Sequence, residues 1–244
     1  MNKSTKILLV LFTPVIFILA HYLGMLPHEY AHSFMAWILG DKSNPLALNY
    51  GGNSWYNLLM LGNMDENVPV APLFAAMKDF HVALMAFAGL GIANGSMYIL
   101  TLWLLAKRSV KQRPFLYYLV FLWNIMNLGN FYDYVPMRTF TTHGDAANFE
   151  QGLHISPWWV YSIGGYIVAF LMCYFFKKTL PTAYKDLQMQ SRLPKASLMI
   201  FSVVILFGFF GATGLYNHGE ISYLLSATSL LAIPGLIYAL WPKA

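Results

Sequence analysis

The sequence predicts an all-α polytopic membrane protein with about six transmembrane helices and a short β-hairpin or re-entrant loop after the first helix. Of its 244 residues, 58% are hydrophobic and 10% are charged, whereas a soluble domain usually carries about a quarter charged residues. Aromatic residues make up 17%, and Tyr and Trp collect at membrane interfaces. Because one span needs roughly 20 apolar residues, the length fits one compact bundle.

Six apolar segments account for the expected helices, and we expect residues 1–244 to form a single membrane-embedded domain. The first segment is unusually long, since residues 6–40 as one helix would extend for about 50 Å. It must therefore tilt, bend near Gly24–Pro27 or project from the membrane. The segments lie at about 6–40, 82–106, 115–135, 157–176, 196–216 and 220–241.

A polar interruption at 41–72 separates the first two segments. Its Asn/Gly pairs flank two short apolar runs, LALNY and NLLML, which is typical of a short hairpin or a re-entrant loop. Elsewhere we find no linker long enough to separate two soluble domains.

Basic residues in the loops predict that both termini are cytoplasmic. One cluster at 107–113 lies between the second and third segments, and another at 177–195 lies between the fourth and fifth. With Lys3, Lys6 and Lys243, these are most of the 15 basic residues, and six crossings place them all on one side. The net charge of +5 then reflects membrane orientation, and no nucleic-acid partner is expected.

The HEYAH motif at residues 28–32 points to metal chemistry. In a helix, His28 and His32 lie one turn apart on the same face, where two imidazoles can share one zinc ion. Glu29 can act as the general base for a zinc-activated water that attacks a carbonyl group. Ionisable residues at membrane depth are costly and usually functional, and the alternative interpretation is a structural polar cluster. The one cysteine, Cys173, excludes an internal disulfide and a Cys-based zinc site.

A third protein ligand is expected from the segment 130–154, because a catalytic zinc ion usually has three protein ligands and one open position. Asp145 follows Gly144 and precedes AANFE, which resembles the start of a helix, so it is either the ligand or only a helix cap. Asp133 is the next candidate. The spacing does not single out His143, Glu150 or His154.

Arg138, in the same segment, has three open roles. It can pair with an acidic neighbour, hold a substrate carbonyl oxygen or anchor the chain at the membrane interface.

In these features the chain resembles the site-2 protease family of intramembrane zinc metalloproteases. The resemblance rests on HEYAH late in the first apolar segment and on the loop at 41–68 that follows it. It rests further on the Gly- and Asn-containing run FAGLGIANGSMY at 87–98 and on NLGNFYDYVPMRTFTTHGD at 127–145. It covers about residues 6–150, the expected metalloprotease core, and leaves 157–241 as additional transmembrane helices.

The resemblance implies a zinc ion held by His28, His32 and an aspartate, with Glu29 activating water and Asn94 positioning the substrate backbone. The expected substrate is a locally unwound peptide within or beside the lipid bilayer. The family's usual Leu-Asp-Gly motif is absent; Asp133 and Gly144-Asp145 are the nearest matches, and we favour Asp145. Typical members hold the site toward the cytoplasm, whereas the loop charges here place it on the opposite side.

Other functions stay open at this point. A membrane zinc hydrolase of lipid amides or esters would use the same residues, although such enzymes usually carry further histidines in later spans. Here His218 lies between the last two segments. Another class of zinc protease would take Glu150 or Glu220 as its third ligand. A non-catalytic metal-binding membrane protein is the remaining alternative.

Overall fold

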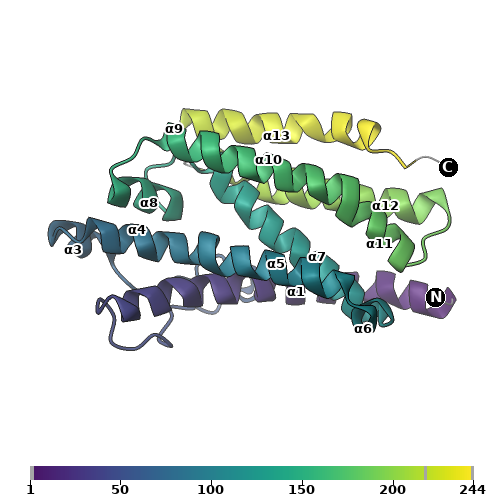
Figure 1. Ribbon diagram of the computed structural model, residues 1–244, viewed down its shortest axis with the longest axis horizontal. Helices are drawn as coiled ribbons and strands as arrows, with labels where there is room; N and C mark the ends of the chain where they lie inside the picture. Colours follow the sequence, from purple (N-terminus) through teal and green to yellow (C-terminus); the bar gives the residue numbers. More distant parts are fainter. Residues whose placement is uncertain (1–2, 217–218, 243–244) are drawn as a thin grey trace.

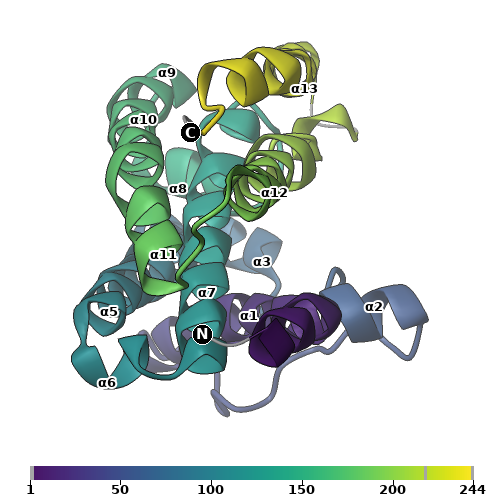
Figure 2. The ribbon, with the colours of Figure 1, turned by 90° about the vertical axis from the view of Figure 1, so that its right-hand side faces the viewer.

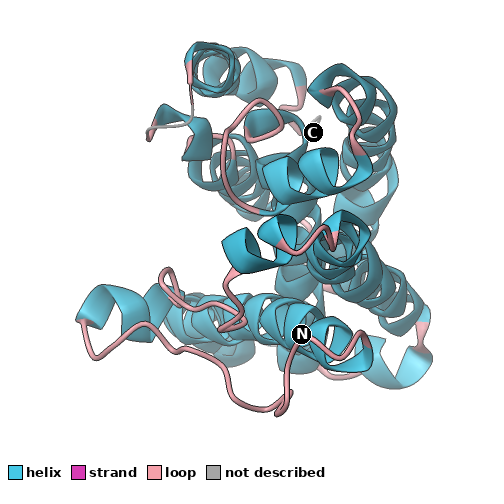
Figure 3. Cartoon of the chain, turned by 90° about the vertical axis from the view of Figure 1, so that its left-hand side faces the viewer, coloured by secondary structure: helices cyan, strands magenta, loops and turns pink. Residues whose placement is uncertain are grey.

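The computed structural model of the chain describes residues 3–216 and 219–242, and this part consists of helices joined by loops, without a β-strand (Figure 3). Lys243 and His218 lie outside the described residues. The elements are α1 (Lys3–Ile38), α2 (Trp55–Met60), α3 (Val70–Ala75), α4 (Asp79–Phe87), η1 (Ala88–Asn94), α5 (Gly95–Ala106), α6 (Arg108–Lys111), α7 (Pro114–Tyr132), η2 (Asp133–Met137), α8 (Asp145–Leu153), α9 (Pro157–Trp159), η3 (Val160–Gly164), α10 (Gly165–Tyr174), η4 (Phe175–Thr179), α11 (Leu180–Asp186), α12 (Arg192–Val203), η5 (Val204–Phe210), η6 (Thr213–Leu215) and α13 (Glu220–Ala239).

The long helices form two layers joined by α7. Helices α1, α4 and α5 make one layer, and α10, α12 and α13 make the other (Figure 1). Helix α7 crosses between the layers and contacts both, as the view along the bundle shows (Figure 2). Helix α1 begins and α13 ends at the same end of the bundle, in opposite layers (Figure 1).

Five helical segments in the described part are long and apolar enough to cross a membrane: Ser4–Ile38, Asp79–Ala106, Pro157–Asp186, Arg192–Leu215 and Glu220–Ala239. The segment expected at 115–135 forms α7 but is not among them. Its asparagines and tyrosines lower its mean hydropathy, and the two layers cover most of it. The sequence thus predicted this helix, while its composition suits the centre of a bundle better than a lipid-facing position.

Large apolar side chains cover the outside of the bundle. On α13, Leu231 and Tyr238 are more than four-fifths exposed, and on α10 the same is true of Tyr166. A soluble monomer rarely exposes apolar surface in large continuous patches, and a lipid-facing helix does so by necessity. The surface therefore agrees with a membrane protein.

Helix α1 is one continuous helix of 36 residues that passes through Pro14 and Pro27. At 1.5 Å per residue it is about 54 Å long, as expected for 6–40 without a hairpin. Its C-terminal half packs against α4, η1 and α7, which brings the HEYAH motif into the bundle.

The loop after α1 does not form the β-hairpin expected at 41–72. Its one β-type contact in the described residues is a bridge between Asn49 and Asp65, while most of NLLML lies in the short helix α2. The Ser54 hydroxyl caps α2 by accepting a hydrogen bond from the Asn57 backbone N–H at 3.0 Å. The buried Asn57 side chain bonds to the surrounding loop backbone, accepting from the Asn63 N–H at 3.0 Å. These local bonds use the polar groups that a strand ladder would need.

Candidate metal centre

Helix α1 presents His28 and His32 one turn apart on its buried face, with exposed fractions of 1% and 2%. This face lies against η1, a stretch of π-helix between α4 and α5. Gly89 of η1 permits the approach, because a Cβ at that position would overlap the His32 imidazole and lie 2.8 Å from Cε1 of His28. The absence of a side chain at residue 89 therefore makes room for both imidazoles.

Both histidines are oriented through their Nδ1 atoms. His28 Nδ1 lies 2.5 Å from Oδ1 of Asn94, and His32 Nδ1 lies 2.6 Å from the backbone oxygen of Met85. Since both partners are oxygen acceptors, each Nδ1 carries the proton and donates it. Each Nε2 is then left with a free lone pair, as in a histidine that binds metal. Asn94 is itself fixed by donating to Oδ1 of Asn127 on α7 at 3.0 Å.

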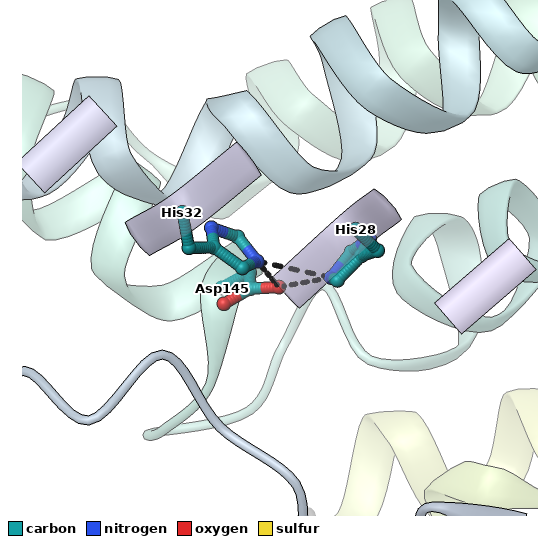
Figure 4. A group of neighbouring side chains, drawn as sticks. All are labelled: His28, His32 and Asp145. Atoms are coloured by element: carbon teal, nitrogen blue, oxygen red, sulfur yellow. Dashed lines mark hydrogen bonds and ion pairs between the residues drawn. The ribbon is translucent and has the colours of Figure 1, made fainter. Parts of the chain in front are cut away.

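Asp145, the first residue of α8, completes the group (Figure 4). Its Oδ2 lies 3.1 Å from Nε2 of His28 and 3.2 Å from Nε2 of His32. Gly144 before it has φ +85°, a backbone conformation that favours glycine and that turns the chain into the helix. Helix α8 packs along α4, which holds Asp145 opposite α1.

The three inward-facing atoms fit one metal ion. The two Nε2 atoms are 3.0 Å apart, so all three separations lie between 3.0 and 3.2 Å. In a tetrahedral zinc site with bonds of about 2.0–2.1 Å, ligand atoms are roughly 3.3 Å apart. Two histidines and one carboxylate also match the three-ligand set of catalytic zinc sites. The group His28, His32 and Asp145 can therefore hold a metal ion.

Electrostatics favour a cation at this point. Two imidazole lone pairs and a carboxylate oxygen converge in a buried space, and without positive charge between them they would repel each other. When both imidazoles are instead protonated at Nε2 as well, they supply this positive charge themselves: burial raises the pKa of Asp145, but the charges of His32 and His28 and their hydrogen bonds hold it well below the usual range. The carboxyl group is thus ionised, as a metal ligand must be.

Glu29 is buried beside this group, with an exposed fraction of 7%. Its carboxyl group interacts electrostatically with His28, His32 and Asp145. Glu66, from the loop after α1, interacts electrostatically with His32 and Asp145, and burial raises its pKa above the ordinary value. Glu29, which directly follows His28 in the sequence, therefore lies close to the metal position without belonging to the ligand group.

The other predicted residues lie outside the ligand group. Asp133, the alternative third ligand, forms an ion pair with Arg138 at 3.3 Å. Of the three roles open to Arg138, the structure therefore shows the pairing with an acidic neighbour. His154 pairs with Asp79 at 2.9 Å. In the part of the chain that the structure describes, the metal-ligating groups brought together are those of His28, His32 and Asp145, without His143, Glu150 or Glu220.

Substrate contacts of Asn94 and Arg138 stay predictions. Asn94 is fully buried, and it contacts His28 on the side away from the metal position. The geometry thus indicates that Asn94 orients His28, one of the three residues that can bind the metal ion.

Sequence reasoning missed three residues near the site. Gly89 belongs to the Gly- and Asn-containing run at 87–98, and this run is the sequence signal for it. Met85 contributes a backbone oxygen and carries no side-chain signal. Tyr134 stacks on His28 with ring centroids 5.4 Å apart, and its position directly after Asp133 was the only hint.

An apolar cavity of about 390 Å³ reaches the ligand group from the side. It lies between η1, α8 and η3, and Asp145 is part of its wall. Trp159 and Ile163, both more than half exposed, form its outer rim. The remaining wall residues are Ala86, Phe87, Leu90, Val135, Ala146, Phe149, Ile155, Val160 and Gly164. Pockets that bind small ligands measure about 300–1,000 Å³, so this cavity can take a short apolar group.

Comparison with protein-family models, with curated proteins and with solved structures finds no match for the chain.

Proposed function

We propose that this chain is an intramembrane zinc metalloprotease that hydrolyses a peptide bond in a transmembrane or membrane-adjacent substrate. The observation that carries the proposal is the convergence of His28, His32 and Asp145 with Glu29 beside them, next to an apolar cavity whose wall includes Asp145. Two histidines, an adjacent glutamate and a third carboxylate ligand form the set that metalloproteases use. The proposal is consistent with the resemblance to site-2 proteases.

Each residue has a defined task in this proposal. Three ligands would hold zinc, which when bound polarises the scissile carbonyl and makes water a stronger nucleophile. Glu29 takes a proton from the attacking water and gives it to the leaving amide nitrogen as the C–N bond breaks. Asn94 and Met85 keep both imidazoles oriented throughout.

The cavity favours an apolar substrate. Its wall is apolar except for Asp145, and its rim of Trp159 and Ile163 lies on the outer surface of the bundle. A peptide in lipid can therefore approach from the side, and an extended segment would place its scissile carbonyl near the ligands. A helical segment must first unwind, because its peptide bonds are hydrogen-bonded and shielded.

In the membrane, we place both termini in the cytoplasm and the ligand group toward the opposite side. The basic loops at 107–113 and 177–195 support this orientation. Counting α7 as a pass in addition to the five apolar segments gives six crossings, an even number, and both described ends lie at one end of the bundle (Figure 1).

The decisive experiment compares the purified wild-type protein with Glu29→Gln and His28→Ala in lipid nanodiscs. Bound zinc is measured by mass spectrometry, and cleavage is measured on a synthetic transmembrane peptide with a central Gly-Pro. We expect Glu29→Gln to keep its zinc and to lose about 10²–10⁴-fold in rate, since it removes a general base. His28→Ala should lose both zinc and activity.

A matched control is His21→Ala, on the same helix. His21 is also buried, but its Nε2 contacts the backbone oxygen of Met60 at 2.7 Å and faces no other ligand. This variant should keep wild-type zinc, and zinc retained in His28→Ala would refute the site. An N-acyl amide lipid is offered beside the peptide. Hydrolysis of the lipid alone would identify a lipid hydrolase, and a zinc-loaded protein that cleaves neither would be a non-catalytic metal-binding protein.

A further inference from the structure

Tyr134 reaches the ligand group from a third direction, through η2. Its hydroxyl oxygen lies 3.3 Å from Nε2 of His28, the atom that faces the metal position. The phenol ring stacks on the His28 imidazole at an interplanar angle of 21°. The side chain therefore ends beside the metal position, yet it is not one of the three ligands.

The surroundings hold this ring in place. The Arg138 guanidinium lies 4.7 Å from the ring centroid, and it is anchored by its ion pair with Asp133. Thr139 donates a hydrogen bond to the Tyr134 backbone oxygen at 3.2 Å. A cation over the ring draws electron density from it, which makes the hydroxyl a better hydrogen-bond donor.

A neutral phenol is a donor that suits one particular moment of peptide hydrolysis. When water oxygen bonds to the carbonyl carbon, the π electron pair moves onto the carbonyl oxygen, which becomes negatively charged. The water proton goes to Glu29, and the C–N bond breaks later as the nitrogen is protonated. Through these steps the growing negative charge on oxygen needs a fixed donor, and such donors contribute much of the rate of acyl transfer.

We propose that Tyr134 is a catalytic residue whose hydroxyl donates a hydrogen bond to the substrate's carbonyl oxygen as that oxygen becomes negatively charged. This inference rests on the proposed protease function and assigns it a specific oxyanion donor. In the absence of substrate the hydroxyl contacts His28. Arg138 and Asp133 act through Tyr134 and are positioning residues.

The test is Tyr134→Phe, which removes one oxygen and keeps the stacked ring. We expect unchanged zinc content and zinc affinity, a fall in kcat of about 10²–10³-fold and little change in KM. The matched control is Tyr132→Phe, two residues earlier, whose hydroxyl donates to Oγ of Ser229 at 3.0 Å and lies away from the ligands. This control should keep kcat within about twofold.

A second readout needs no substrate. Acetohydroxamate presents an anionic oxygen to a zinc site, and calorimetry on the zinc-loaded proteins measures its binding. Loss of one hydrogen bond to a charged oxygen should weaken binding by about tenfold or more in Tyr134→Phe. The Tyr132→Phe protein should bind acetohydroxamate like the wild type.

Two outcomes would overturn the assignment. A lower zinc affinity of Tyr134→Phe would make Tyr134 a metal ligand, and unchanged kcat with unchanged hydroxamate binding would make it a bystander. If the wild type binds zinc and hydroxamate but cleaves no peptide, protease function fails while the hydroxamate comparison still tests the donor. If the wild type binds no zinc, both proposals fall.

Discussion

The two halves of the chain bury different kinds of polar side chain. Up to residue 154, the buried set includes His, Glu, Asn and Asp side chains, among them His28, Glu29 and Asn94. From residue 157 onward, the buried polar side chains among the described residues are hydroxyls alone: Thr179, Ser202, Ser222, Ser226 and Ser229. The halves have similar apolar composition, so the difference lies in what the polar groups do.

In the C-terminal half, two of the buried hydroxyls named above donate to backbone carbonyl oxygens. Ser202 donates to the Leu198 carbonyl one turn earlier, and Ser229 of α13 donates to the Phe207 carbonyl of η5, both at 2.8 Å. Such bonds satisfy a polar group at little cost and require no partner side chain. In the N-terminal half, side chains bond to side chains on other helices, as Asn94 does with His28 and Asn127.

This contrast separates a scaffold from a site. A network of polar side chains between helices fixes the positions of those side chains, but burying it in apolar surroundings costs free energy. Such a network is therefore expected mainly where the function requires a fixed geometry. Changes in the C-terminal half should therefore have small effects on metal binding, and changes in the side-chain network around His28 and His32 in the N-terminal half should have large ones. The following predictions test that division.

The largest effect is expected from Gly89→Ala. A methyl group there overlaps the His32 imidazole, and both histidines lie on a helix that cannot move away without repacking. We expect zinc affinity to fall by more than the roughly 10–100-fold that loss of an outer partner causes. Calorimetric titration with zinc in nanodiscs measures it.

The control is Gly95→Ala, which lies in the same continuous helical segment. A Cβ at residue 95 meets nothing within 4 Å, so zinc affinity should stay at the wild-type level. Equal zinc affinity in both variants would show that η1 does not determine the placement of the imidazoles.

A smaller effect is expected from Asn94→Ala. It removes the acceptor for Nδ1 of His28 but leaves all three ligands, so zinc affinity should fall by about 10–100-fold. Ser229→Ala is the comparison from the other half: it removes the bond to the Phe207 carbonyl and the acceptor of the Tyr132 hydroxyl, so we expect a stability loss of about 1–3 kcal/mol and unchanged zinc affinity. If Ser229→Ala weakens zinc as much as Asn94→Ala, the proposed division of the molecule is wrong.

The sequence predicted the helical class and the pairing of the two histidines because these depend on local patterns. Apolar runs identify helices, and a spacing of four residues places His28 and His32 on one face. Asp145 was favoured from Gly144 and the helix start after it, and the structure places it, rather than Asp133, at the histidines.

The remaining features depend on contacts between distant segments. Gly89 matters only because η1 packs on α1, and Tyr134 is separated from His28 by 106 positions in sequence. Of the two forms expected at 41–72, the β-hairpin was wrong because capping by Ser54 and the bonds of Asn57 favoured a helical turn, and the re-entrant loop stays a prediction. The hydrophobic periodicity of one segment carries no information about its contacts with a distant segment.

The smallest predicted effect concerns Glu150, a buried carboxyl group of the N-terminal half that has no ligand role. Burial raises its pKa from 4.5 to about 7, and its Oε1 has no hydrogen-bond partner among the described residues. The folded state therefore holds this proton more tightly than the unfolded chain does. Stability from this group is fully present below about pH 4.5 and decreases as the pH rises to about 7.

Glu150→Gln removes this pH dependence and keeps the size of the side chain. The variant and the wild type should melt alike near pH 4.5, and the variant should melt higher by about 2–4 °C at pH 8, the shift that about 1 kcal/mol causes in a chain of this length. Thermal unfolding of the metal-free proteins across this range measures the difference, and removal of metal excludes effects of ligand protonation on zinc binding. A difference that is constant with pH would show that Glu150 does not titrate in the folded state. A difference that grows with pH would show that Glu150, which is not one of the three ligands, lowers the stability of the folded protein when it ionises. The C-terminal half, whose buried polar side chains among the described residues are hydroxyls, has no such cost.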